Sequence, residues 1–235
     1  MLAGKEYVCV MWLHSQVPKN RLKKVLEEFQ GKIYQRPPVR SSVKRRLRTR
    51  TIYYIDFMEM QERKVLFKVG CEAGTYIRKL CYDIGEVLGC GAHMQELRRT
   101  RVGPFVEDES LVTLHDISYL YSQWKETKDE RLLRKFVFPM EKALDLLPKI
   151  HIRDSAVSAL CHGAHLTAPG VLSLDDGIKV GETVAVLTQK GEAVTLSKTV
   201  VTSEKLLKMD HGFVAKTQRV LMPRGIYPKM WYKNQ

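Results

Sequence analysis

The run Lys5–Leu13, KEYVCVMWL, limits the possible folds of this chain more than any other segment. Almost all of its residues are apolar and many are good β-formers, which is typical of a strand covered on both faces. Such a strand also needs neighbours on both edges, because an open edge leaves backbone groups unpaired. The sequence therefore predicts a sheet with this segment in its interior. Since the run starts close to residue 1, we expect the chain to be the C-terminal part of a larger domain.

The neighbouring elements follow from their periodicity. Pro18–Phe29 has apolar residues at spacings of three and four, which predicts an amphipathic helix. Thr51–Phe57 and Lys64–Cys71 are rich in β-formers and predict a strand pair, joined by the polar Glu59–Arg63 turn region. Ala92–Arg99 is expected to add a further turn or two of helix.

The stretch Gly74–Leu80, GTYIRKL, opens a predicted helix with an unusual cation. Thr75 is a good N-cap residue, and it would put Arg78 at the third helical position, where the helix dipole disfavours positive charge. Asp83 and Glu86 lie five and eight residues further on and are poorly placed to pair with it. We therefore expect a carboxylate from elsewhere to bind Arg78, which lies off the apolar stripe of Ile77, Leu80, Cys81, Ile84 and Leu88.

Net charge indicates a polyanionic partner. The 39 Lys and Arg against 26 Asp and Glu leave a formal charge of +13, which favours nucleic acid through counterion release. The densest cluster is Gln35–Arg50, here called the basic segment, with seven basic residues, no acid and a Pro-Pro start that forbids a regular helix. It could clamp RNA, dock a protein partner or form a solvated loop. The candidate RNA contacts are Lys5, Arg36, Arg40, Lys44, Arg45, Arg46, Arg48, Arg98, Arg99, Gly163, Arg219 and Arg224.

The character of the chain changes at Pro148. Before it, a mixed-charge stretch from Thr113 to Leu147 has helical periodicity. After it, short β-rich runs alternate with Gly turns and one compact helix near Asp154–Cys161, which predicts a small β-barrel-like module. The expected fold class is α/β (α+β), with domains at 1–147, built on a mixed sheet with helices, and at 148–228.

Cysteine usage and hydropathy argue against a disulfide-bonded secreted protein, a zinc protein and a membrane protein. The five cysteines have no paired spacing and are interpreted as free thiols. Cys161, His162 and His165 supply too few ligands for a zinc site, so neither a metal nor another cofactor is predicted. Without a membrane-length apolar run or a signal-peptide pattern, a cytoplasmic protein is expected.

Five strings resemble one known family. Glu72–Phe105, EAGTYIRKLCYDIGEVLGCGAHMQELRRTRVGPF, resembles the motif III region of the TruB-type pseudouridine synthases, specifically the archaeal homologues of dyskerin. KEY at Lys5–Tyr7 is similar to the Lys-x-Tyr motif of that family, and RPPVRSSVKRR to its Pro-Pro segment. DSAVSALCHGAHLTAPGV, together with VLMPRGIYP, looks like a PUA domain. The resemblance extends over essentially the whole chain.

The resemblance implies the catalytic subunit of a box H/ACA ribonucleoprotein, which isomerises uridine to pseudouridine in ribosomal RNA and in transfer RNA. A catalytic aspartate attacks the flipped uridine, and by motif match Tyr7 stacks on the base, Tyr76 and Arg78 line the pocket and Leu97 forms its wall. The arginine pairs with the aspartate. Implied partners are guide RNA, substrate RNA and three small accessory proteins: a zinc-ribbon type, a Gly/Arg-linked protein and a kink-turn binder.

One part of the family pattern is missing from the 235 residues. The family's aspartate lies in a Gly-x-Leu-Asp-Pro loop before the Lys-x-Tyr strand, and no such string occurs in this sequence. Glu6 precedes Tyr7, but strand alternation places it on the opposite face. This chain alone is therefore expected to be inactive. The alternative interpretation is a non-catalytic, PUA-containing RNA-binding scaffold protein.

Overall fold

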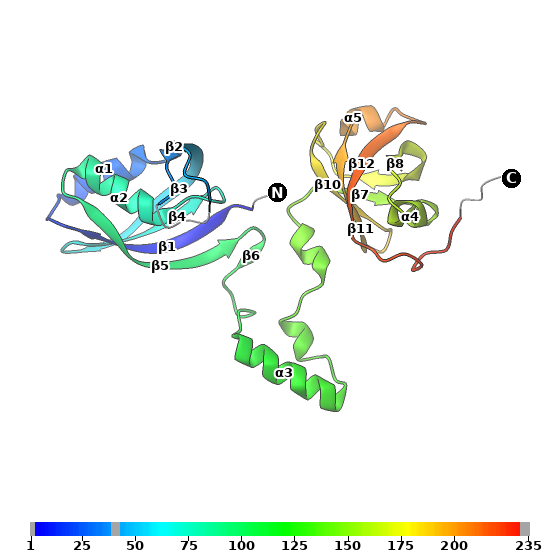
Figure 1. The fold of residues 1–235 in the computed structure, drawn as a ribbon, viewed down its shortest axis with the longest axis horizontal. Coiled ribbons are helices and arrows are strands. Elements are labelled where there is room, and N and C mark those ends of the chain that lie inside the picture. Colours follow the sequence, from blue (N-terminus) through cyan, green and yellow to red (C-terminus); the bar gives the residue numbers. More distant parts are fainter. Residues whose placement is uncertain (1–2, 39–42, 231–235) are drawn as a thin grey trace. The chain divides into compact units, whose positions relative to one another are not determined.

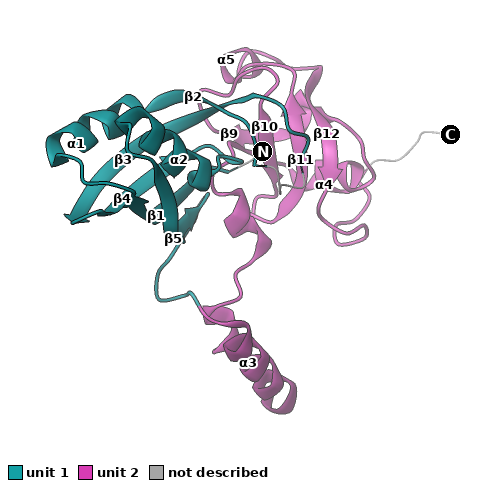
Figure 2. Cartoon of the chain, turned by 60° about the vertical axis from the view of Figure 1, so that its left-hand side comes forward, with its two compact units in different colours: residues 1–111 teal, residues 112–235 magenta. Residues whose placement is uncertain are grey.

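The computed structural model describes residues 3–38 and 43–230, shown as a ribbon in Figure 1. The chain forms two compact units, residues 1–111 and 112–235, coloured separately in Figure 2. The α/β (α+β) fold class predicted from the sequence is confirmed. The boundary predicted between residues 147 and 148 stays a prediction.

Unit 1 is built on a six-stranded sheet with the order β2-β3-β4-β1-β5-β6. β1 pairs with β4 on one edge and with β5 on the other, so its predicted interior position is confirmed. The pairings in this sheet are antiparallel. The strands are β1 (Lys5–Leu13), β2 (Gly31–Gln35), β3 (Arg48–Gln61), β4 (Lys64–Cys71), β5 (Ala92–Val102) and β6 (Phe105–Val106).

Only one face of β1 is fully buried. Cys9, Met11 and Leu13 are inaccessible, whereas the even-numbered side chains between them are partly exposed. The expectation that both faces of the strand would be covered is therefore wrong within unit 1. Buried and partly exposed side chains alternate along the C-terminal half of β1, because successive side chains of a strand point to opposite faces of the sheet.

Two helices cover the buried face, α1 (Lys19–Glu28) and α2 (Ile77–Leu88), and both lie along the same side of the sheet in Figure 1. The apolar stripe predicted for α2 is buried and joins the stripe of α1 and the odd-numbered residues of β1 in one core. The helix predicted at Pro18–Phe29 is confirmed as α1, with Leu22, Val25 and Leu26 buried. α2 ends at Gly89, whose positive φ of 70° suits glycine.

Two local predictions in unit 1 are wrong. Ala92–Arg99 is not helical, because it forms most of β5 and takes its backbone hydrogen bonds from β1. β3 extends beyond the predicted Thr51–Phe57 in both directions, so the polar residues after it belong to the strand and the turn shrinks to Glu62 and Arg63. For Ala92–Arg99 the pairing with the distant β1 outweighs local propensity, whereas the polar end of β3 pairs with the adjacent β4 in one hairpin.

The stretch from Thr113 to Leu147 is helical only in part. α3 (Leu114–Thr127) begins at Thr113, whose side chain and that of Asp116 form a reciprocal capping box. Two short 3-10 turns follow, η1 (Leu133–Lys135) and η2 (Met140–Leu144). None of the residues of α3 is buried in this structure.

Unit 2 contains a barrel-like sheet with the order β8-β12-β11-β10-β7-β9. The predicted small β module is confirmed, and the compact helix has its predicted bounds. Buried side chains from α4 and from the strands form its core. The elements are β7 (Lys149–Ile152), α4 (Asp154–Cys161), β8 (Leu166–Thr167), η3 (Ala168–Gly170), β9 (Val171–Leu174), β10 (Thr183–Leu187), β11 (Ala193–Thr199), α5 (Ser203–Leu206) and β12 (Phe213–Val220).

Candidate active site

Unit 1 has a pocket of about 310 Å³ where β1, β5 and the start of α2 meet. The four residues predicted as catalytic, here called the pocket quartet, all line it: Tyr7, Tyr76, Arg78 and Leu97. They come from segments up to 90 positions apart in the sequence, and the fold brings them to one place. Their chemical roles stay predictions. The other lining residues are Pro38, Thr75, Ile77 and Met94.

The start of α2 differs from the predicted one. Tyr76 is the N-cap residue, in an extended conformation, so the prediction of Thr75 as N-cap is wrong. The hydroxyl of Thr75 instead donates to the carbonyl of Glu72 at 2.7 Å and closes the turn before the helix. Arg78 is consequently the second helical residue and not the third. The helix dipole still disfavours a cation there.

Arg78 is exposed and has no ion pair among the residues that the structure describes. Asp83, one of the local acids considered as a partner, pairs with Lys79. No acidic residue lines the pocket in the described part of the chain. The guanidinium is therefore open to a carboxylate or phosphate that reaches the pocket from elsewhere.

Tyr7 is half-buried and packs against the core of unit 1. Burial raises the pKa of its phenol, an effect that the charge of Arg99, its partner in β5, partly offsets. The hydroxyl is therefore neutral at physiological pH. A neutral ring fixed by sheet packing can offer its face to a planar base.

Glu6 cannot supply the missing acid of the pocket. Its carboxylate accepts a hydrogen bond from the hydroxyl of Tyr54 and another from the Thr100 hydroxyl at 2.7 Å. The bond from Tyr54, followed by the one from Thr100, lowers the pKa of the Glu6 carboxyl. The side chain is committed to these partners and does not line the pocket.

The predicted RNA contacts differ in their surroundings. In the basic segment, Arg45 donates to the Pro37 carbonyl at 3.3 Å and Arg48 to the Lys44 carbonyl at 3.2 Å. Arg98 forms an ion pair with Glu107. Arg40 lies outside the described residues. Lys5 is partly exposed, and the exposed candidates include Arg36, Lys44, Arg45, Arg46, Arg99, Gly163, Arg219 and Arg224.

The two histidines near Cys161 in unit 2 each use Nδ1 in a hydrogen bond within the chain. Nδ1 of His162 contacts the Ser158 carbonyl at 2.7 Å, and Nδ1 of His165 accepts from the backbone N–H of Thr217 at 3.3 Å. The five cysteines are free thiols, as predicted. Within residues 3–38 and 43–230 no group of three or more His, Cys, Asp or Glu is arranged to hold a metal. No described helix has the length and apolar character needed to span a bilayer.

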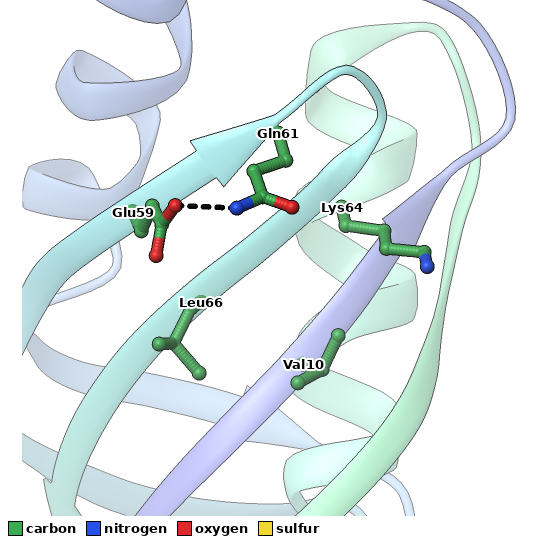
Figure 3. A pocket seen from close by; sticks show the side chains of 5 residues that line it. All are labelled: Val10, Glu59, Gln61, Lys64 and Leu66. Atoms are coloured by element: carbon green, nitrogen blue, oxygen red, sulfur yellow. Dashed lines mark hydrogen bonds between the residues drawn. The ribbon is translucent and has the colours of Figure 1, made fainter.

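A second hollow lies on the partly exposed face of the same sheet (Figure 3). Val10 and Leu66 form its floor, and Glu59, Gln61 and Lys64 surround them. It contains no member of the pocket quartet. The quartet lines the other pocket, which includes Tyr7 and the start of α2.

Family profiles match both units. The profile for the tRNA pseudouridylate synthase B C-terminal domain matches residues 78–145, and that for the PUA domain matches 148–221. A profile for Pus10, C-terminal, matches residues 2–88. These matches place the chain in the class of pseudouridine synthases that carry a PUA domain.

Full-length relatives narrow this class. The chain is 56% identical over 229 residues to a probable tRNA pseudouridine synthase B of Pyrococcus horikoshii, covering 97% of this chain and 69% of that protein. The corresponding protein of Methanosarcina barkeri is 55% identical, with 100% and 69% covered. The chain belongs to the TruB-type pseudouridine synthases, in their archaeal dyskerin-like branch, a family of isomerases.

Solved structures agree with this assignment. A structure of an H/ACA RNP bound to a substrate RNA containing 2'-deoxyuridine is 51% identical with a TM-score of 0.91, covering 98% of this chain and 69% of that chain. A Cbf5-Nop10-Gar1 complex is 54% identical, also with a TM-score of 0.91, covering 97% and 70%.

Sequence reasoning missed four residues that border or hold the pocket. Pro38, Ile77 and Met94 line it, and the buried Gln35 contacts Tyr76 from behind. No local signal identifies Gln35, because its partner is 41 residues away. Pro38 lies within the Pro-Pro start of the basic segment, which indicated a break in helical structure and a family motif but not a pocket wall.

Proposed function

We propose that this chain contributes the pocket in which an RNA-guided H/ACA particle isomerises a target uridine to pseudouridine. The observation that supports this most strongly is that the pocket quartet, taken from separate motifs, lines one pocket of about 310 Å³. That volume is at the lower end for ligand sites and suits a single nucleoside. A base inside a duplex cannot reach such a pocket, so the target nucleotide has to leave its stack.

Each member of the quartet has a physical task in this proposal. Tyr7 stacks on the flipped base, and such stacking is worth about 1–3 kcal/mol per base. Leu97, with 39% of its surface exposed, offers the base an apolar wall. Tyr76 lies beside the reacting nucleotide.

Arg78 binds the nucleophilic aspartate through two parallel hydrogen bonds and keeps it ionised. During the isomerisation the bond from N1 to C1′ breaks and a bond from C5 to C1′ forms, while the proton on C5 leaves to solvent and N1 takes up a proton, so that the product is an isomer of uridine. The described residues place no carboxylate in the pocket, so the aspartate reaches Arg78 from outside them.

RNA binding follows from the charge distribution. A guide RNA selects the uridine by base pairing, the basic segment contacts phosphates and the PUA module binds the 3′ end of the guide. The H/ACA RNP and Cbf5-Nop10-Gar1 structures support an assembly with substrate RNA and small accessory proteins. We further propose an archaeal, cytoplasmic setting with ribosomal and transfer RNA as targets; the relatives are named for the transfer RNA reaction.

Tritium release from uridine-5-labelled RNA tests the proposal. The particle is assembled from the chain, guide RNA and accessory proteins, with and without a polypeptide carrying a Gly-x-Leu-Asp-Pro loop. We expect turnover only when that loop is present. Arg78→Lys should reduce turnover about a hundredfold, because an ammonium cannot form the two parallel bonds.

Arg131→Lys is the matched control, since the side chain of Arg131 is 88% exposed and forms its ion pair with Asp129 in unit 2. Rapid turnover without any added loop, or equal activity of the two arginine variants, would refute the assignment of the nucleophile. RNA binding without turnover under every condition would instead support the scaffold interpretation.

A further inference from the structure

Gln35, the last residue of β2, has a buried side chain that contacts the pocket from behind. Only 2% of the residue is exposed. Its Oε1 accepts a hydrogen bond from the backbone N–H of Tyr76 at 3.0 Å, and its Nε2 donates to the carbonyl of Tyr76 at 3.2 Å. Both functional groups of one amide thus bind the backbone of a single residue of the pocket quartet.

The residue held in this way determines where α2 begins. Tyr76 is the N-cap, with φ of −98° and ψ of 102°, and no side chain of the helix itself caps it. Ile77 and Arg78 follow directly and both line the pocket. A shift of Tyr76 would therefore displace its own ring and redirect the guanidinium of Arg78.

A second contact binds the other end of the basic segment to the same turn. The carboxylate of Glu72 accepts from the backbone N–H of Thr51 at 3.1 Å and from the guanidinium of Arg50 at 3.3 Å. Gln35 also pairs with Arg48 in the sheet. Both ends of the basic segment are therefore hydrogen-bonded to the short stretch that leads from residue 72 to the start of α2.

The basic segment also reaches the pocket directly. Pro38, three residues after Gln35, lines the pocket together with Tyr76. Gln35 therefore connects two parts of the pocket wall: Pro38 follows it closely in the chain, and Tyr76 is hydrogen-bonded to its amide. A displacement of the basic segment would move both residues.

We infer that Gln35 is a positioning residue for the isomerisation: it sets the place of Tyr76 and Arg78 and couples the basic segment to the pocket. It does not touch the uridine. The kinetic consequences rest on the function proposed above. When RNA phosphates bind the basic segment, the two amide bonds hold the pocket walls in one arrangement.

Gln35→Glu in the assembled particle separates positioning from simple support of the fold. A protonated carboxyl has one donor and one acceptor, as the amide has, whereas the ionised form can only accept and repels the carbonyl of Tyr76. We expect kcat to fall about tenfold to a hundredfold at alkaline pH, with KM changed less than about threefold, and to recover as the pH falls and the carboxyl becomes protonated.

Gln61→Glu is the matched control. The amide of Gln61 lies on the other face of the same sheet and donates to the exposed Glu59 side chain at 2.7 Å (Figure 3). Its turnover should follow the pH profile of the unaltered particle. A loss in Gln35→Glu that is the same at every pH would contradict the inference.

Hydrogen exchange in the chain itself provides a readout that needs no turnover. With Gln35→Leu, the amide of Tyr76 should exchange at least about tenfold faster, because its acceptor is gone, while the amide of Ile84 in the middle of α2 is unchanged. Gln61→Leu should change neither. Unchanged exchange at Tyr76 would overturn the inference even if the proposed function holds, and faster exchange would support it even if the particle proves inactive. If Gln35→Leu fails to fold, the pH profile of Gln35→Glu decides the question.

Discussion

Gly85→Ala tests how closely α2 and β5 must approach for the pocket to form. Gly85 is buried in α2, and the chain turns back over it between Gly89 and Ala92. A Cβ atom at this position would lie 2.1 Å from the backbone nitrogen of Ala92 and 2.6 Å from the carbonyl carbon of Gly91. Ordinary contacts begin at 3.4 Å, so the entry to β5 has to move by about 1.3 Å.

The two contributions to the free energy of unfolding have opposite signs. Alanine is favoured over glycine in a helix interior by about 1 kcal/mol. Overpacking costs about 1–3 kcal/mol or more, and the backbone shift required here puts it at or above the upper end of that range. We therefore expect a net destabilisation of at least about 2 kcal/mol. A separation of about 1 Å between α2 and β5 would also reduce turnover, by up to about a hundredfold, since Arg78 and Leu97 lie on these two elements.

The assay is urea denaturation followed by hydrogen exchange in peptides from β1 and β5, because a chain of two units need not unfold in one transition. Glu86→Ala is the matched control: Glu86 is the next, exposed residue of α2, and its replacement should change the stability by less than about 0.5 kcal/mol. If Gly85→Ala were as stable as the unaltered chain or more stable, the close approach of helix and strand would be refuted.

Two further predictions concern charge. Replacing Arg45 and Arg46 together by Glu should weaken RNA binding and flatten its dependence on salt, because fewer counterions are released; an unchanged slope in filter-binding titrations would mean that these side chains do not contact phosphate. For Glu6, hydrogen bonds from Tyr54 and Thr100 lower the folded-state pKa below the ordinary value of 4.5, so the stability that the charged group contributes is present above pH 4.5 and is lost as the pH falls through the folded pKa. The advantage of the unaltered chain over Glu6→Gln in urea midpoints should therefore shrink from about pH 7 to about pH 3, and a constant difference would show that the carboxylate charge is not responsible.

Local patterns were sufficient for the elements that carry their own hydrophobic periodicity. β4 and α4 have the predicted bounds, and α1 lies within the predicted Pro18–Phe29. Each of these segments matches one period along its whole length and ends near a glycine, a proline or a polar turn. Such signals require only neighbours in sequence, so the chain itself contains them.

The predictions failed where distant backbone supplies the hydrogen bonds. From the neighbouring residues alone, Ala92–Arg99 could form a helix and Thr75 could cap α2. In the structure, Ala92–Arg99 pairs with β1, and Tyr76 is the N-cap because its backbone is bound by another segment. The pairing with β1 and the amide of Gln35 decide both cases. Neither partner can be recognised from the residues nearby.

The sequence by itself determined the family, the core-facing stripes and the identity of the pocket quartet, because motifs and periodicity are properties of consecutive residues. Only the tertiary structure decided that the quartet shares one pocket, that Arg78 has no partner among the described residues, and that Gln35 holds Tyr76. The shared pocket and the hydrogen bonds of Gln35 join segments about 40 to 90 positions apart. Such contacts form only when the sheet brings the segments together, since closing each long loop is unfavourable until the packing of the whole core offsets it.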